Sequence, residues 1–360
     1  MARGEKKTKK RRIVGGVDTH ANTHHAAVVM MNGGRIADAQ FPATSAGYEQ
    51  LVEWMRSFGR LHAVGVEGTG SYGAALARHL RAGGIVVIEV NRPDRRQRRN
   101  VGKSDPLDAY AAADAVLAGR ATARPKSGDG IVESIRVIHL ARSGAVKART
   151  ACLNELRGLL VTAPASLRER LPGLGAEPLT RACARLRPAG DLAAPEQSAK
   201  LALRSLARRY QALTAEIDGL HLQLKALIAR ARPDLLSIHG VGVETAAQLL
   251  TTCGDNPDRL TSESAFAALC GVAPIPASSG KTTRHRLSRG GDRQANRALH
   301  MIALTRMAWC PRTRAYVDRR TADGKSKAEI RRCLKRYIAR ELFKALTSKT
   351  NPTSDLRSAA

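Results

Sequence analysis

Aromatic side chains are scarce in this sequence, since Phe, Trp and Tyr together make up only 3% of its 360 residues. Proteins that bind single strands by stacking the bases depend on such side chains. The scarcity therefore argues against a stacking platform. Contacts from Lys and Arg to a phosphate backbone are the binding mode that remains for a polyanionic partner.

The sequence also lacks any apolar run of the roughly 18–20 residues that are needed to cross a bilayer. Its basic first residues, 1–12, are not followed by the apolar segment of a secretory signal. These absences predict a cytoplasmic protein with no membrane partner. We interpret residues 1–12 as a disordered arm that binds phosphates, and residues 351–360 as a disordered tail.

Cysteine pairs are missing as well, because the six cysteines include no CxxC motif and no Cys/His pair at zinc spacing. Each cysteine lies among apolar neighbours, which predicts buried, reduced thiols. His20, His24 and His25 come closest to a metal-binding cluster. Their segment is typical of a turn that enters a strand, so no His-bound metal is expected.

Acidic residues are outnumbered by 60 Lys and Arg to 31 Asp and Glu, which leaves a net charge of +29. A field of this size concentrates polyanions around the protein, and nucleic acid is the first partner that it predicts. The basic segments 1–12, 92–103, 281–297 and 325–349 are expected to bind phosphates with a steep dependence on salt.

Residues 13–125 alternate strand and helix signals. A short apolar run ends at Asp18, two strands at 26–31 and 35–41 flank an Asn-Gly-Gly turn, and a buried strand ends at Glu67. A hairpin followed by β-α-β units predicts an α/β domain with a mixed sheet and helices on its faces.

Residues 126–234 are rich in Ala, Leu and Arg and are interrupted by Pro and Gly near their middle. From Leu201 to Leu227, leucine and isoleucine recur at about 3.5-residue spacing, which predicts a helical hairpin or a coiled coil. A plain bundle within one chain and a dimer through this segment are both compatible with the pattern.

Residues 235–350 predict a mostly α-helical domain. The stretch SIHGVGVETAAQLL has the form of a helix-hairpin-helix, in which Gly240 and Gly242 make the turn and the second helix offers N–H groups to a phosphate. An ordinary turn before a helix is the alternative. Further helices are expected over 262–271, from Ala295 to Met307, and in the basic tail 324–349.

Four acids are notable for their positions. Asp18 and Glu67 each end an apolar strand, whereas Asp105 and Asp108 are three residues apart at the start of a helix and so share one face. Together they predict a pocket of carboxylate oxygens of the kind that Mg²⁺ prefers. Two such ions can hold the attacking and leaving oxygens during phosphoryl transfer.

A structural explanation competes for two of these acids. Asp105 before Pro106 could cap a helix, and Asp108 would then complement the helix dipole. Capping does not account for the two acids that end strands, so the metal hypothesis is preferred. Glu89 and Asp114 are the acids that could take their places if the assignment is wrong.

The motifs GGVDTH, GVEGTGSYG and KSDPLDAYAAA, in this order, resemble the amino-terminal RuvC-like DEDD domain of IS110 family transposases. The block GVAPIPASSGKTTRHRLSRGGDRQANRALHMIAL resembles the carboxy-terminal transposase domain of the same family. The resemblance covers the chain apart from its two tails. It implies an RNase H-like fold, Mg²⁺ held by Asp18, Glu67, Asp105 and Asp108, and a guide RNA encoded by the element that selects target and donor DNA.

In the family, a serine before a glycine in the carboxy-terminal loop is the nucleophile, and Ser279 before Gly280 matches it here. Its neighbour Ser278 remains an alternative. No His-Asp pair stands at triad spacing, so a metal or a base must activate the hydroxyl. A basic loop whose Ser-Ser-Gly is only a turn is the other interpretation. The family often has Asn where this chain has Asp292.

The leading interpretation is a transposase or recombinase that acts on DNA with a guide RNA, as a dimer or tetramer. The alternatives are a RuvC-like junction nuclease that uses metal-activated water alone, and a non-catalytic nucleic-acid binder. The predicted domains are 13–125, 126–234 and 235–350. The residues expected to bind nucleic acid are Arg95, Arg96, Arg98, Arg99, Lys103, Gly240, Gly242, Lys281, Arg284, Arg286, Arg289 and Arg293.

Overall fold

The computed structural model describes residues 11–91, 104–171, 173–278, 280, 285–286, 288 and 290–348. The chain divides into two compact units. The first comprises Met1–Gly130 and Cys253–Thr261, and the second comprises Ile131–Thr252 and Ser262–Ala360. The predicted division into domains at residues 125 and 234 stays a prediction.

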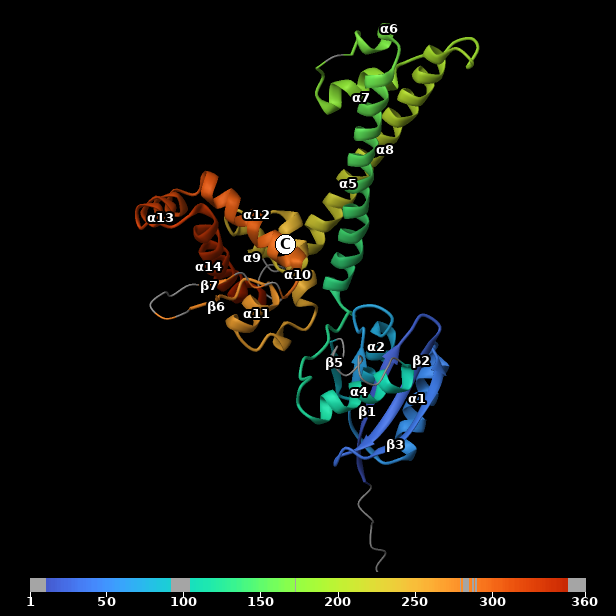
Figure 1. Cartoon of the computed structure of the whole chain (residues 1–360), viewed down its shortest axis with the longest axis vertical. Helices are drawn as coiled ribbons and strands as arrows, with labels where there is room; N and C mark the ends of the chain where they lie inside the picture. Colours follow the sequence, from blue (N-terminus) through green and yellow to red (C-terminus); the bar gives the residue numbers. More distant parts are fainter. Residues whose placement is uncertain are drawn as a thin grey trace, which may run out of the picture. The chain divides into compact units, whose positions relative to one another are not determined.

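The first unit is built on a five-stranded mixed sheet in the order β3-β2-β1-β4-β5 (Figure 1). Strands β1, β2 and β3 form an antiparallel meander, while β4 and β5 run parallel to β1. This arrangement confirms the predicted hairpin and mixed sheet, and it is consistent with an RNase H-like domain. The strands are β1 (Arg12–Thr19), β2 (Thr23–Met30), β3 (Arg35–Pro42), β4 (Arg60–Glu67) and β5 (Val87–Val90).

Helices cover both faces of this sheet. Helices α1 (Ser45–Ser57) and α2 (Ala74–Ala82) pack on one face against alternate strand residues such as Val17 and Val66. Helix α4 (Asp105–Leu117) packs on the other face, where Val14 belongs to its core. Side chains alternate along a strand, so even-numbered residues of β1 face α4.

Helix α4 lies very close to the sheet because glycines line its path. A Cβ added at Gly16 would lie 2.1 Å from the Ala109 carbonyl oxygen, and one at Gly65 would lie 2.7 Å from that of Ala112. No side chain larger than hydrogen fits at either place without moving the helix. The two glycines thus allow the short distance between α4 and strands β1 and β4.

A short segment far along the chain completes the first unit. Asn256 donates from Nδ2 to the Pro125 carbonyl over 3.0 Å and accepts at Oδ1 from the Ser127 amide over 2.9 Å. The segment also holds the single-turn 3-10 helix η1 (Pro257–Arg259). No local pattern in the sequence pointed to this long-range return.

The second unit contains a long helical hairpin. Helices α5 (Ile131–Thr162) and α8 (Pro195–Ala231) run antiparallel, because Cys152 bonds to Leu206 over 3.1 Å and the earlier Arg149 bonds to the later Thr214 over 3.5 Å. The predicted helices are confirmed and pack within one chain, whereas the coiled coil stays a prediction. Between them lie α6 (Ala165–Arg168) and α7 (Ala176–Ala184), which the sequence analysis missed.

The remainder of the second unit is helical apart from one two-stranded ribbon (Figure 1). The tail helix α14 buries Ile330, Leu334, Ile338, Leu342 and Leu346, as its apolar spacing predicts. None of the described helices is both long and apolar enough to span a membrane. The elements are α9 (Pro233–Ser237), α10 (Val243–Cys253), α11 (Glu263–Leu269), β6 (Ile275–Pro276), β7 (His285–Arg286), α12 (Arg293–Trp309), α13 (Pro311–Ala322) and α14 (Lys327–Thr347).

We expect Gly16→Ala to lower the free energy of unfolding of the first unit by at least about 1–3 kcal/mol, because its methyl group overlaps the backbone of α4. Urea denaturation followed by Trp54 fluorescence, in a Trp309→Phe background, measures this. Gly70→Ala is the matched control, since a Cβ there meets nothing within 4 Å, and its effect should stay within about 0.5 kcal/mol. An equal loss in both variants would contradict the close packing.

Candidate active site

The candidate site begins where two parallel strands end. Val17 of β1 pairs with Val66 of β4, so the next residues, Asp18 and Glu67, stand at adjacent strand ends. The Thr19 hydroxyl donates to the Glu67 carbonyl over 2.9 Å and ties the two ends together. Both acids lie two residues beyond a glycine over which α4 passes, so both side chains belong to the face that α4 covers.

The first turn of α4 supplies the other two predicted acids. Asp108 is buried, with 4% of its surface exposed, whereas 47% of the Asp105 side chain is exposed. The N-cap residue is Ser104, and Asp105 is already helical. The hypothesis that Asp105 caps this helix is therefore wrong, because the helix starts one residue earlier than the position of Pro106 suggested.

His20 lies between two of these acids. Its Nε2 atom is 3.1 Å from Asp18 Oδ2 and 3.4 Å from Asp105 Oδ1. One ligand atom from each of the three residues lies within 4.8 Å of the others. The sequence analysis predicts a turn at His20 and no metal bound by it. The available signal was its spacing of two from Asp18, which puts both residues on one side of the chain.

Burial raises the pKa of Asp18 above its ordinary value. The neighbouring imidazole of His20 opposes that shift in the pKa of Asp18, and the nearby carboxylates of Asp108 and Asp105 add to it. Ionised carboxylates thus repel one another in this pocket. A cation among them would relieve this repulsion.

The two spare acids do not join the cluster. Glu89 of β5 pairs with Val66, so it lies on the other face of the sheet from Glu67, and its carboxylate accepts from the Thr69 hydroxyl over 2.9 Å. Asp114 lies nearly two turns beyond Asp108 on α4. Neither acid takes the place of a predicted one.

The donor atoms fit a hard divalent cation. Carboxylate oxygens from two elements and one imidazole nitrogen converge on a partly buried place. Mg²⁺ prefers carboxylate and water oxygens and keeps part of its hydration shell. The exposure of Asp105 leaves one side of the cluster accessible to water and to a phosphate.

The predicted serine loop belongs to the second unit. Strands β6 and β7 pair as a short ribbon through Ile275–Arg286 and Pro276–His285. Ser278 follows β6 and is exposed, and Gly280 adopts a positive φ of 55°. Ser279 lies between them in the chain and outside the described residues. The ribbon places the Ser-Ser-Gly stretch in the connection between its two strands.

A packed junction holds the two ends of this loop together. Asn296 donates from Nδ2 to the carbonyls of Cys270, over 3.0 Å, and Gly271, over 2.9 Å. The Lys335 ammonium in turn donates to Asn296 Oδ1 over 2.8 Å, and burial lowers the pKa of Lys335. At the far end, the Asp292 amide donates to the Leu269 carbonyl over 2.6 Å.

Asp292, where the family often has Asn, caps helix α12. Its Oδ1 accepts from the amides of Gln294 and Ala295, and its Oδ2 accepts from the Thr252 hydroxyl over 2.7 Å. The two carboxylate oxygens together accept all three bonds. The Asp at this position therefore has a structural role in the chain.

Gly240 and Gly242 precede α10, but they have different surroundings. Gly240 has a φ of 83°, and a Cβ there would lie 3.3 Å from the Ile302 carbonyl, so packing on α12 explains this glycine. Gly242 is exposed, with open space around it. The helix-hairpin-helix stays a prediction.

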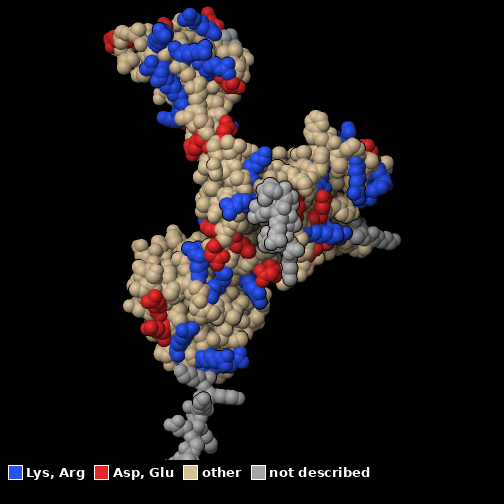
Figure 2. Space-filling view, turned by 180° about the vertical axis from the view of Figure 1, so that it is seen from behind, with Lys and Arg blue, Asp and Glu red and all other residues tan. Residues whose placement is uncertain are grey.

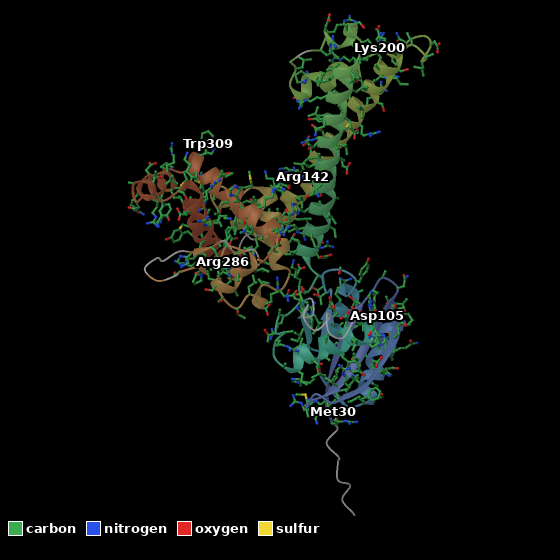
Figure 3. The ribbon with its side chains drawn as sticks, viewed as in Figure 1. Met30, Asp105, Arg142, Lys200, Arg286 and Trp309 are labelled. Atoms are coloured by element: carbon green, nitrogen blue, oxygen red, sulfur yellow. The ribbon has the colours of Figure 1, made fainter. Side chains whose placement is uncertain are left out.

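Two of the ten predicted phosphate-binding cations lie within the described residues. They are Arg286 of β7 (Figure 3) and Arg293 in the first turn of α12, and both are exposed. The others lie outside the described residues, and they are Arg95, Arg96, Arg98, Arg99, Lys103, Lys281, Arg284 and Arg289.

A mixed α/β sheet with acids gathered at the ends of its parallel strands defines the class: a domain with an acidic site suited to a divalent metal. A family model for the DEDD transposases of IS110, described as Transposase, matches residues 15–163. A second model, described as Transposase IS116/IS110/IS902 family, matches residues 233–318. The chain therefore belongs to the IS110 family of transposases.

Curated relatives agree with this family. The chain is 36% identical over 149 residues to an uncharacterized 43.6 kDa protein of insertion element IS110 from Streptomyces coelicolor, covering 41% of this chain and 36% of that protein. It is 30% identical over 133 residues to a 42 kDa protein of IS900 from Mycobacterium paratuberculosis, covering 36% and 33%. It is 32% identical over 210 residues to a probable family 20 transposase of Pseudomonas aeruginosa, covering 53% and 56%. The match thus spans from a third to just over half of each relative.

We expect Mg²⁺ to stabilise the first unit by about 2.7 kcal/mol at a concentration one hundred times its Kd. The double variant Asp18→Asn, Asp105→Asn should lose this gain because two of the three converging ligand groups are neutralised. The measurement is the shift of the Trp54 unfolding midpoint between EDTA and Mg²⁺. Glu49→Gln, an exposed acid on α1, should keep the full shift. A double variant that keeps it would refute the assignment.

Proposed function

We propose that the chain is a transposase that cuts and joins DNA by phosphoryl transfer at the ends of an IS110-like insertion sequence. The observation that carries this proposal is the convergence of ligand atoms from Asp18, His20 and Asp105. Strands β1 and β4 end side by side, and Asp105 and Asp108 lie in the first turn of α4 on the same face of the sheet. Family membership supports it, because matches to transposase models extend over both units.

In this proposal Asp18, Glu67, Asp105 and Asp108 hold Mg²⁺. Bound there, the metal would supply charge stabilisation to the reacting phosphate. The chain itself keeps the acids in place through the Thr19–Glu67 bond and the glycine contacts of α4. His20 bridges Asp18 and Asp105 and fixes the spacing of their oxygens.

The proposed nucleophile is Ser279, by its match to the family motif. Its Oγ forms a bond to phosphorus while the bond from that phosphorus to one sugar oxygen breaks. The serine gives up its hydroxyl proton, and the departing sugar oxygen takes one up. The junction of Asn296, Lys335 and Asp292 restrains both ends of the loop that carries this serine.

Nucleic-acid contacts follow from the same proposal. Arg286 and Arg293 are exposed after the Ser-Ser-Gly stretch, in β7 and α12, and would bind the DNA backbone beside the reacting phosphate. The open Gly242 at the start of α10 would let a phosphate approach the backbone amides there. A guide RNA encoded by the element would supply sequence choice, and a dimer or tetramer, joined in part through α5 and α8, would hold two DNA partners.

Ser279→Ala should abolish the covalent protein–DNA adduct, because no other oxygen replaces the lost hydroxyl. The assay incubates labelled DNA with protein and its co-purified RNA and separates adducts on a denaturing gel. Ser278→Ala is the matched control and should keep the adduct. If Ser279→Ala still cuts DNA at the normal rate without an adduct, the chain is instead a nuclease that uses water.

Asp105→Asn should slow both cutting and adduct formation by at least about 100-fold, because a metal ligand is lost while the helix keeps its length. The same gel assay reports both products over time. Glu49→Gln should react at the normal rate, since it removes an acid far along the sequence from the cluster and exposed on α1. Unchanged cutting and adduct formation by Asp105→Asn would refute the role of this carboxylate as a metal ligand.

A further inference from the structure

The end of the helical hairpin formed by α5 and α8 is a folded body in its own right. The last turns of α5, the first turns of α8, and the short helices α6 and α7 enclose a separate apolar core that includes Leu156, Leu167, Leu179 and Leu203. We call this body the hairpin tip, residues 153–209. Its surface side chains therefore stand on a fixed framework.

Basic side chains gather on the hairpin tip (Figure 2). Arg157 of α5, Arg185 and Arg187 after α7, and Arg208 of α8 are exposed, and Arg204 of α8 is half-buried. Within the described part of the chain, none of these five forms an ion pair. We call them the tip arginines.

Three of the five acids of the tip pair with neighbouring cations, and the other two are Glu155 and Asp191. Glu177 pairs with Arg181 one turn away on α7. Glu196 pairs with Lys200 over 2.7 Å on α8 (Figure 3). These local pairs take up carboxylates that could otherwise neutralise the tip arginines. A net positive surface remains.

Contacts within the tip bring its cations together from different elements. The Ala189 amide donates to Gln197 Oε1 over 2.9 Å, which holds the segment of Arg187 beside the first turns of α8. On α8, Arg204 and Arg208 are four residues apart and therefore share a face. Like charges at this spacing repel and disfavour a helix. An anionic partner would remove that repulsion.

The rest of α8 does not share this composition. Glu216 and Asp218 are exposed beyond the tip, and Lys225 is the next cation after Arg209. A helix of 37 residues is about 55 Å long, so the charge is concentrated at one end of it. A merely soluble helix surface would alternate its charges along its length.

The tip also lacks any aromatic side chain, since Tyr210 is the first after Tyr110. Base stacking is therefore excluded there, and sequence-independent contact to phosphates is the chemistry that the arginines offer. We propose that the hairpin tip is an additional binding site for the phosphate backbone of a nucleic-acid duplex. This proposal depends on the proposed function in one respect, namely that the partner is nucleic acid.

The test compares two triple variants of the full chain in EDTA, so that strand chemistry plays no part. The tip variant is Arg185→Gln, Arg204→Gln, Arg208→Gln. The matched control, Lys147→Gln, Lys225→Gln, Arg230→Gln, removes the same charge from exposed positions of α5 and α8 outside the tip. Each is titrated with a 30-bp DNA duplex and a 30-bp RNA duplex of mixed sequence over a salt series.

For at least one duplex, the tip variant should bind at least about tenfold more weakly. The magnitude of its slope of log K against log salt should fall by about 2.7, since each of the three lost phosphate contacts contributes about 0.9. The control should change the slope by less than about one half. Loss for RNA alone, DNA alone or both identifies the duplex that binds. If neither duplex responds, or the control loses as much, the proposal is wrong.

Folding and function are kept apart in this design. Circular dichroism should show the same melting temperature for the tip variant and the wild type. If the triple variant melts earlier, the single variant Arg204→Gln replaces it, with an expected slope change of about 0.9 for one phosphate. A single variant without such a change overturns the proposal. A failure of Ser279 or Asp105 chemistry would leave the binding result standing.

Discussion

Helix α4 rests directly on the backbones of β1 and β4, and the candidate site depends on this contact. Gly16 and Gly65 leave the helix room to approach, and each stands two residues before an acid that ends its strand. The same alternation that turns the glycines toward α4 turns Asp18 and Glu67 toward it. The helix brings its own acids in its first turn, so a single packing contact places Asp105 beside Asp18.

Bringing these carboxylates together lowers the stability of the folded chain. The pKa of Asp18 is raised by burial and by its acidic neighbours, and a group of like charges at one place opposes folding. Such unfavourable clusters occur where a ligand removes the repulsion, and they are often functional. The second unit shows a related feature, because the buried cation Lys335 donates to Asn296, which bonds to the chain where the serine loop begins.

The helical hairpin combines stability with a second kind of charge pattern. Leucines of α5 and α8 pack within one chain, and the tip has its own apolar core. Three of its five acids pair with neighbouring cations, whereas the five tip arginines form no ion pair among the described residues. The family resemblance drew attention to two blocks outside this region. Helices α6 and α7 share one core with the ends of α5 and α8, so arginines that are distant in the sequence lie on one folded body.

The sequence by itself determined the strands, the long helices and the acids, because these follow from local periodicity and from turn chemistry. The family motifs also predict Ser279 as the nucleophile, which neighbouring residues alone would not single out. Tertiary structure decided which of these residues lie close together. The place of His20 between Asp18 and Asp105, the exclusion of Glu89 from the cluster, and the return of Asn256 to the first unit all depend on contacts between distant segments. Local patterns carry no information about such contacts, because strand pairing and helix packing are set by the whole core.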